Sequence, residues 1–138
     1  MADLWIHEGF CTYSESMYVE CLHGYDVAEE YINAKKPYID NLEPIQGVYD
    51  VNNEGAGDMY SKGSLMLNTL RHVVNNDKLW WTVINKMVAT EFYLSETDAD
   101  EVIDFFEQET GKSLRPTFEH YLKKSAIPTL VVDVQQKG

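Results

Sequence analysis

The amino-terminal helical run, over residues 4–23, constrains the fold more than any other stretch of this chain. Asp3 is placed to cap its first turn and Gly24 to stop its last. Glu8 and Glu15 are seven residues apart, so they share one face of the predicted helix. Two carboxylates on one face of a largely apolar helix have two explanations, which are metal ligation and simple solvation.

Five further segments carry the spacing or the boundary residues of helices. They are 26–36, 58–75, 77–91, 97–110 and a run that begins near Pro116. Residues 38–57 are punctuated by Pro, Gly and Asn, which predicts an irregular loop of a length that is often functional. Residues 127–134 are rich in β-branched side chains and predict a lone strand. The sequence thus predicts a mainly α fold, a helical bundle or array with this strand at its end.

Two capping sites and one buried stripe can be assigned within these segments. Asp58 is expected to cap the helix over 58–75. Thr97 and Asp100 are expected to form the capping box of the helix over 97–110. The buried stripe of the 58–75 helix is predicted to contain Met59, Gly63, Met66, Leu70 and Val73. Within that stripe, Gly63 permits close helix packing.

Charge and cysteine content argue against several classes of function. The 138 residues form one domain or part of one, and their net charge of −12 argues against binding to nucleic acid and to anionic membranes. No apolar run approaches the roughly 20 residues of a membrane-spanning helix, and no signal peptide is visible at the amino terminus. Cys11 and Cys21 are ten residues apart, which favours two buried free thiols over a zinc knuckle or a redox pair.

Residues 7–11, HEGFC, form a candidate metal motif. His7 and Cys11 lie at i and i+4 and share a helix face, as two ligands of a zinc helix do. An independent His7/Cys11 zinc site would need further ligands, and none follows at a suitable spacing. The pair alone therefore does not define a metal site.

As part of a longer motif, the same region resembles the aminopeptidase-N-type zinc metallopeptidases, the gluzincins. Residues 5–15 read WIHEGFCTYSE, where the family segment is Trp-(Leu/Ile)-x-Glu-Gly-Phe-Ala-x-Tyr-x-Glu. The resemblance implies that Glu8 is the third zinc ligand and that Glu15, seven residues on, supports the metal site. His7 and Cys11 depart from the usual Asn and Ala, at positions that supply no ligand in the family.

A second segment strengthens the resemblance. Residues 58–71 read DMYSKGSLMLNTLR and are similar to the family helix Tyr-x-Lys-Gly-x-x-x-Leu-x-x-Leu-Arg. This implies that Tyr60 is a catalytic residue that stabilises the oxyanion, a role that suits a donor aimed at developing negative charge. Residues 105–128 resemble the run that closes the family's catalytic domain, ahead of a β-sandwich domain.

The resemblance implies a fold and a place within a larger enzyme. Residues 1–126 would form the helical C-terminal half of a thermolysin-like catalytic domain, and residues 127–138 the start of a following β domain or a linker. The family's His-Glu-x-x-His helix, which holds two zinc ligands and the general base, is absent from the sequence and would precede Met1. We therefore expect a fragment of a zinc-dependent aminopeptidase that hydrolyses peptides with zinc-activated water.

By itself, the chain is expected to be inactive and to bind no zinc tightly, since catalytic zinc needs three protein ligands. Its expected partners are the remaining part of the catalytic domain and, in the intact enzyme, a peptide substrate. An apolar face left exposed without that part would allow self-association. The alternative is a non-catalytic helical interaction domain that retained the peptidase fold.

Overall fold

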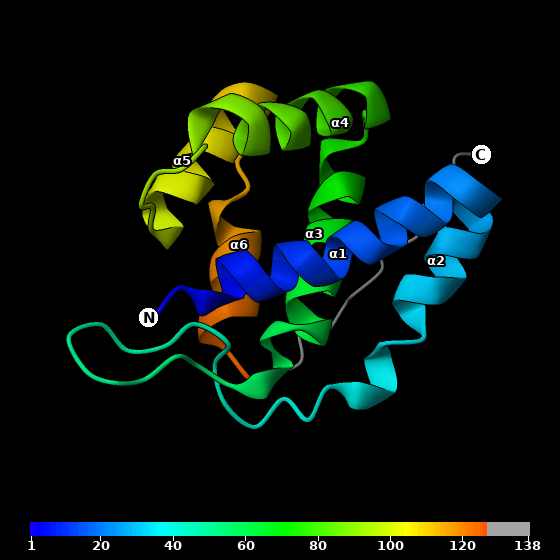
Figure 1. Ribbon diagram of the computed structural model, residues 1–138. Coiled ribbons are helices and arrows are strands. Elements are labelled where there is room, and N and C mark those ends of the chain that lie inside the picture. Colours follow the sequence, from blue (N-terminus) through cyan, green and yellow to red (C-terminus); the bar gives the residue numbers. More distant parts are fainter. Residues whose placement is uncertain (127–138) are drawn as a thin grey trace, which may run out of the picture.

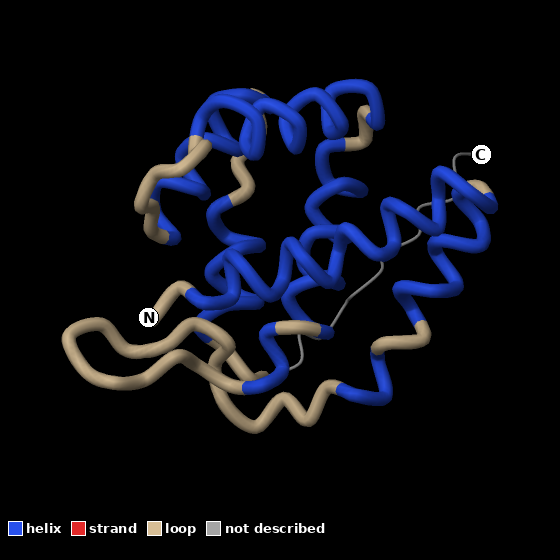
Figure 2. The backbone as a smooth tube through the Cα atoms, in the orientation of Figure 1, coloured by secondary structure: helices blue, strands red, loops and turns tan. Residues whose placement is uncertain are grey.

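The computed structural model describes residues 1–126, and this part of the chain is helical and contains no strand (Figures 1 and 2). Its α-helices are α1 (Leu4–His23), α2 (Tyr25–Asn33), α3 (Ser61–Val74), α4 (Asp77–Lys86), α5 (Ala99–Thr110) and α6 (Arg115–Lys123). Its shorter turns are the 3₁₀ helices η1 (Lys36–Tyr38) and η2 (Gly57–Met59) and the π-helical turn η3 (Met87–Glu91). The predicted mainly α fold is confirmed. The strand predicted at 127–134 and the second predicted segment, 127–138, lie outside the described residues.

The helices are arranged around a central crossing of α1 over α3 (Figure 1). The chain turns at Gly24, whose φ of 90° suits glycine, so that α2 packs back against α1. Helix α4 packs on α3 and α5, and α6 packs on α3 and α5. No helix within residues 1–126 is both long enough and apolar enough to cross a bilayer.

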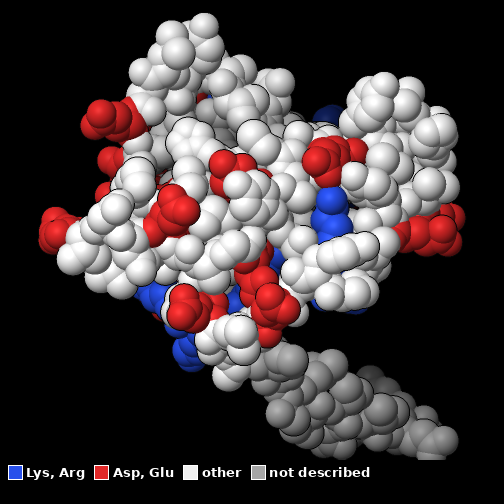
Figure 3. Space-filling model, turned by 60° about the horizontal axis from the view of Figure 1, so that its bottom comes forward, with Lys and Arg blue, Asp and Glu red and all other residues white. Residues whose placement is uncertain are grey.

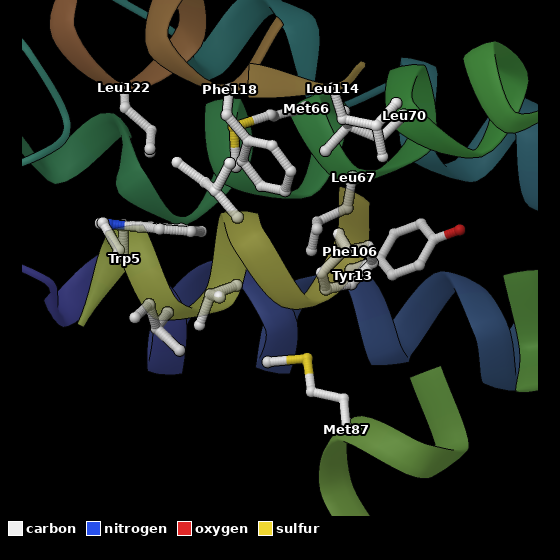
Figure 4. Packing of buried hydrophobic residues seen from close by; sticks show 14 of the residues in the cluster. Trp5, Tyr13, Met66, Leu67, Leu70, Met87, Phe106, Leu114, Phe118 and Leu122 are labelled. Atoms are coloured by element: carbon white, nitrogen blue, oxygen red, sulfur yellow. The ribbon is translucent and has the colours of Figure 1, made fainter. Parts of the chain in front are cut away.

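A chain of aromatic contacts runs through the core that these helices enclose (Figure 4). Ring centroids lie 6.2 Å apart for Trp5 and Phe118, 5.8 Å for Phe118 and Phe106, and 5.6 Å for Phe106 and Trp80. Trp80 then meets Tyr13 edge-on at 6.2 Å and donates its indole N–H to the Tyr13 hydroxyl at 3.1 Å. Burial raises the pKa of Tyr13 to about 12, so this hydroxyl stays neutral. The aromatic residues therefore join α1, α4, α5 and α6.

A buried arginine fixes the other end of α1. Arg71 on α3 is 4% exposed, and its guanidinium donates to both carboxylate oxygens of Glu20 at 2.6 and 2.9 Å. Its Nε also donates to Asp77, the first residue of α4, at 2.9 Å. Such two-pronged pairing is the strongest geometry for this ion pair. Arg71 therefore connects α1, α3 and α4.

The irregular segment between η1 and η2 is fixed against the amino terminus, which confirms the loop predicted from the sequence. Ile45 is fully buried in the core, and the Gly47 N–H donates to the Ala2 carbonyl at 2.8 Å. The Asp3 carboxylate accepts from Gln46 at 2.9 Å and from the Tyr49 hydroxyl at 2.6 Å. Asp3 precedes α1 as predicted, but its side chain does not cap the helix because these loop donors use it.

The start of α3 also differs from the sequence prediction. The helix begins at Ser61, and Asp58 lies in η2 instead of capping it. The buried Asp58 carboxylate accepts from the backbone N–H groups of Asp40 at 3.0 Å and Asn41 at 2.6 Å, which satisfy it in place of the first N–H groups of α3. At the other end of α3, Val74 is buried in place of the predicted Val73, which is 42% exposed.

Two further predictions were wrong in detail. The capping box of α5 uses Asp98 and Glu101, one residue later than predicted: Asp98 accepts from the Glu101 N–H at 2.9 Å, and Glu101 accepts from the Asp98 N–H at 3.3 Å. Cys11 and Cys21 are exposed free thiols and not buried ones.

Replacing Arg71 by Met should lower the free energy of unfolding by about 3 kcal/mol, because the substitution leaves the Glu20 carboxylate without its buried partner. Urea unfolding followed by circular dichroism measures the change. Arg115→Met is the matched control: Arg115 pairs with two largely exposed carboxylates, so its loss should change the free energy by less than about 1 kcal/mol. Equal effects of the two substitutions would contradict the structural role of Arg71.

Candidate functional site

The candidate site is built on the contact between two glycines where α1 and α3 cross. A Cβ placed on Gly63 would lie 3.0 Å from the Gly9 Cα, and one placed on Gly9 would lie 3.4 Å from the Met59 carbonyl oxygen. Side chains at these positions would therefore separate the helices. Glu8 is adjacent in sequence to Gly9, and Tyr60 to Met59. The crossing thus brings together the two backbone segments that carry the residues singled out in the sequence, Glu8 and Tyr60.

Glu8 has the features of a side chain that is available to a ligand. It is half-buried on α1. Within residues 1–126, no hydrogen bond or ion pair joins its carboxylate to another side chain. The backbone at Glu8 is held in place, because α1 contacts α3 at Gly9 and packs into the core. A carboxylate in this setting can serve as a monodentate or bidentate metal ligand.

Tyr60 joins η2 to α3 and is 46% exposed. Two buried charged residues fix the backbone on either side of it. On one side, Asp58 holds the loop amide of Asn41. On the other, the Lys62 ammonium donates to the Asn41 side-chain oxygen and to the Lys124 carbonyl, each at 2.7 Å. The Tyr60 ring is therefore presented to solvent from a well-anchored turn.

Reasoning from the sequence missed the anchoring role of both residues, since it assigned Asp58 to a helix cap and gave Lys62 no role. Lys62 is 6% exposed and Asp58 is 8% exposed. Burial lowers the pKa of Lys62, and the nearby Asp58 charge works against that shift. The sequence does carry a signal for this role. An acidic residue lies two positions before Tyr60 and a basic residue two positions after it, within a predicted helix whose apolar stripe indicates burial.

Glu15, the third residue singled out, has partners on the neighbouring helix and the turn after it. Its Oε2 accepts from the Lys35 ammonium and from the Tyr31 hydroxyl, each at 2.9 Å. The hydrogen bond from Lys35, followed by that from Tyr31, lowers the pKa of Glu15. Glu15 therefore fixes α1 to α2, a role that the sequence did not indicate.

The described part of the chain contains no cluster of metal-ligating side chains. No group of three or more His, Cys, Asp or Glu side chains in residues 1–126 is placed to hold a metal ion. This holds for His7 and Cys11, which line the same open groove but have no third ligand beside them there.

That groove has a volume of about 620 Å³ and lies between the amino-terminal half of α1 and residues 87–97. Its walls include the apolar side chains Ile6, Phe10, Met87, Val88 and Phe92. Val88 is 58% exposed and Leu94 is 90% exposed. Exposed apolar side chains along a groove are typical of a surface that packs against another part of a protein.

Replacing Gly63 by Ala should destabilise the protein by about 1 kcal/mol or more, because the strain of separating α1 from α3 exceeds the helix-propensity gain. Urea unfolding measures the change. Gly57→Ala is the matched control: no atom lies within 4 Å of an added Cβ there, so stability should change by less than about 0.5 kcal/mol. A Gly63→Ala variant as stable as the original chain would refute the close crossing.

Glu15→Gln should flatten the acid limb of the stability profile. Because the folded-state pKa of Glu15 lies below its ordinary 4.5, its bonds contribute stability above pH 4.5 that is lost as pH falls through the folded-state value. The pair is exposed, so the contribution at neutral pH should be at most about 1 kcal/mol. Thermal unfolding between pH 3 and pH 7 tests this, with the exposed loop residue Glu54 changed to Gln as control. Identical acid limbs for both variants would contradict it.

Comparisons with known proteins give a structural relative only. No protein-family model matches the sequence, and no curated protein matches it. Among solved structures, the chain is similar to a mutant M1 zinc metallopeptidase from Deinococcus radiodurans bound to a Tyr-Ser-Ala substrate. The TM-score is 0.74 at 20% identity, over 94% of this chain and 29% of that one. The helices described here therefore have the fold of the helical part of an M1 peptidase domain.

Proposed function

We propose that this chain is part of the catalytic domain of a zinc-dependent aminopeptidase, in which Glu8 is one zinc ligand and Tyr60 stabilises the oxyanion. One observation supports the proposal most directly: the Gly9–Gly63 contact brings together the backbone segments that carry Glu8 and Tyr60, in a fold shared with an M1 zinc metallopeptidase. The order and spacing of the two motifs around these residues support the same assignment.

Glu8 fits the ligand role by its chemistry and its surroundings. Its carboxylate is joined to no other described side chain, and its helix is rigidly packed. A catalytic zinc ion takes three protein ligands, and residues 1–126 bring no such set together. The two other ligands would therefore come from the remaining part of the catalytic domain, outside this chain. Zinc, when bound, would supply the Lewis acidity and the activated water for peptide hydrolysis.

Tyr60 fits the role of a hydrogen-bond donor to the substrate. Its side chain is half-exposed, and its backbone is held by Asp58 and Lys62. A positioned donor to a developing oxyanion typically contributes about 3 kcal/mol to catalysis. Glu15 would support the zinc site at a distance, because its bonds to Tyr31 and Lys35 hold α1 in place.

The groove of about 620 Å³ between α1 and residues 87–97 is the surface on which the remaining part of the catalytic domain would pack. In that part's absence, the exposed apolar side chains there would allow the isolated chain to self-associate. The isolated chain would neither hold zinc tightly nor cleave peptides. Both properties require ligands and a general base from the other part.

The test is a protein in which this chain is joined to the segment that carries the other ligands. Glu8→Gln should remove most bound zinc, measured by metal analysis after dialysis, and most activity on an aminoacyl p-nitroanilide. Tyr60→Phe should keep the zinc but lower kcat by about 10²-fold or more. Glu54→Gln, in the exposed loop, is the control and should change neither.

Two results would contradict the proposal. One is full zinc occupancy and activity in the Glu8→Gln protein, which would exclude Glu8 as a ligand. The other is a calorimetric titration in which the isolated 138-residue chain binds one equivalent of zinc tightly, since its ligands would then all lie within the chain. A joined protein that binds zinc through neither part and cleaves no peptide would favour the helical interaction domain instead.

A further inference from the structure

A second groove differs in charge from the rest of the molecule. The chain has 23 acidic and 11 basic residues, and acidic side chains prevail on the face shown in Figure 3. The groove, of about 520 Å³, lies between α2, α3 and α6. Its charged lining consists of three lysines, Lys36, Lys62 and Lys124, and one acid, Glu29. Neither Glu8 nor Tyr60 lines it.

The one acidic residue of this lysine-lined groove is already engaged. The Glu29 carboxylate accepts from the Asn68 side-chain N–H at 3.0 Å and lies 3.5 Å from His72 Nε2. The groove is therefore cationic at its lysine-bearing end, in a protein whose net charge is −12. An electropositive concavity on an acidic protein concentrates anions locally.

Lys62 is the feature that most strongly indicates an anion. Its residue is 6% exposed, and its ammonium donates to two neutral acceptors, the Asn41 side-chain oxygen and the Lys124 carbonyl. An ammonium has three N–H donors, so one is left for a ligand. Among residues 1–126, no carboxylate forms an ion pair with it. The charge of the Asp58 carboxylate acts on this ammonium without a hydrogen bond, because Asp58 accepts from the loop N–H groups of Asp40 and Asn41. The third N–H donor of Lys62 can therefore bind an anion placed in the groove.

The remaining walls add an apolar surface to this charge. Leu65 and Ile39 line the groove and are only partly buried by the protein itself. Beside them, the Thr69 and Tyr121 hydroxyls lie 3.0 Å apart and can share a hydrogen bond with each other or with a ligand. The groove therefore offers one cationic end and one mainly apolar wall, at a volume typical of small-molecule sites.

We propose that this groove binds a small organic carboxylate with an apolar body. The carboxylate accepts from the Lys62 ammonium, with Lys36 and Lys124 contributing charge at the exposed rim. The apolar body lies against Leu65 and Ile39. The proposal does not rest on the zinc and peptide roles proposed for Glu8 and Tyr60, although Lys62 also anchors the turn that carries Tyr60.

The test uses the full 138-residue chain, labelled with ¹⁵N, and three probes. N-acetyl-leucine carries both the carboxylate and the apolar body, N-acetyl-leucinamide lacks the charge, and inorganic phosphate lacks the apolar body. N-acetyl-leucine should bind saturably with a Kd on the order of 1 mM. Its shift changes should centre on Ile39, Lys62 and Leu65. The amide and phosphate should each bind at least about tenfold more weakly.

Lysine variants then assign the charge. Lys62→Met and the exposed Lys36→Gln should each weaken N-acetyl-leucine binding by about threefold or more. Lys112→Gln, an exposed lysine outside the groove, is the matched control and should leave the binding unchanged. If Lys62→Met does not fold, Lys36→Gln still tests the site.

Four outcomes would overturn the proposal. They are the absence of saturable binding, equal affinity for the acid and its amide, equal affinity for phosphate, and equal weakening by the Lys36 and Lys112 substitutions. Shift changes confined to the groove between α1 and residues 87–97 would also refute it, because they would place the ligand elsewhere.

Discussion

The crossing of α1 and α3 depends on the contact between Gly9 and Gly63. Each glycine lies between two large buried side chains, four residues before it and four after it. On α1 these are Trp5 and Tyr13; on the other segment they are Met59, in the turn η2 just before α3, and Leu67 on α3. Residues four apart share a helix face, so each helix has a notch between two bulky side chains, and the notches fit together. The aromatic residues on either side of the α1 notch then reach the core formed with α4, α5 and α6.

A close crossing fixes one point on each helix, and further contacts are needed to fix the angle between them. Along α1, those contacts follow in order: Tyr13 with Trp80, Glu15 with Lys35, and Glu20 with Arg71. All of them lie on the carboxyl side of Gly9. On its amino side, Asp3 is bonded to Gln46 and Tyr49 of the loop. Glu8 therefore sits between two sets of restraints, as a site that must hold a ligand in one geometry requires.

The sequence predicted what is local. The helical segments followed from periodicity, and the two site residues from short motifs. The errors arise where distant residues compete for a polar group: Asp58 accepts from the loop N–H groups of Asp40 and Asn41, eighteen and seventeen positions away, so it does not cap α3. The exposure of Cys11 has a geometric cause. It lies two residues from both Gly9 and Tyr13, which places it about 200° around the helix from the buried face. A general tendency of cysteine to be buried could not reveal that orientation.

The approach of the segments that carry Glu8 and Tyr60 could not be predicted from either motif alone, because some fifty residues separate them and the glycine contact between the two segments is visible in neither motif. The two faces of helix α3 likewise contact different parts of the molecule. One face, with Gly63 and Leu67, packs on α1 and the core, and the other, with Lys62 and Asn68, lines the cationic groove. Burying the Lys62 ammonium is unfavourable, and its two neutral hydrogen bonds and the nearby Asp58 charge offset this in part. One of its three N–H donors has no partner among the described residues, and the proposed carboxylate would supply that partner.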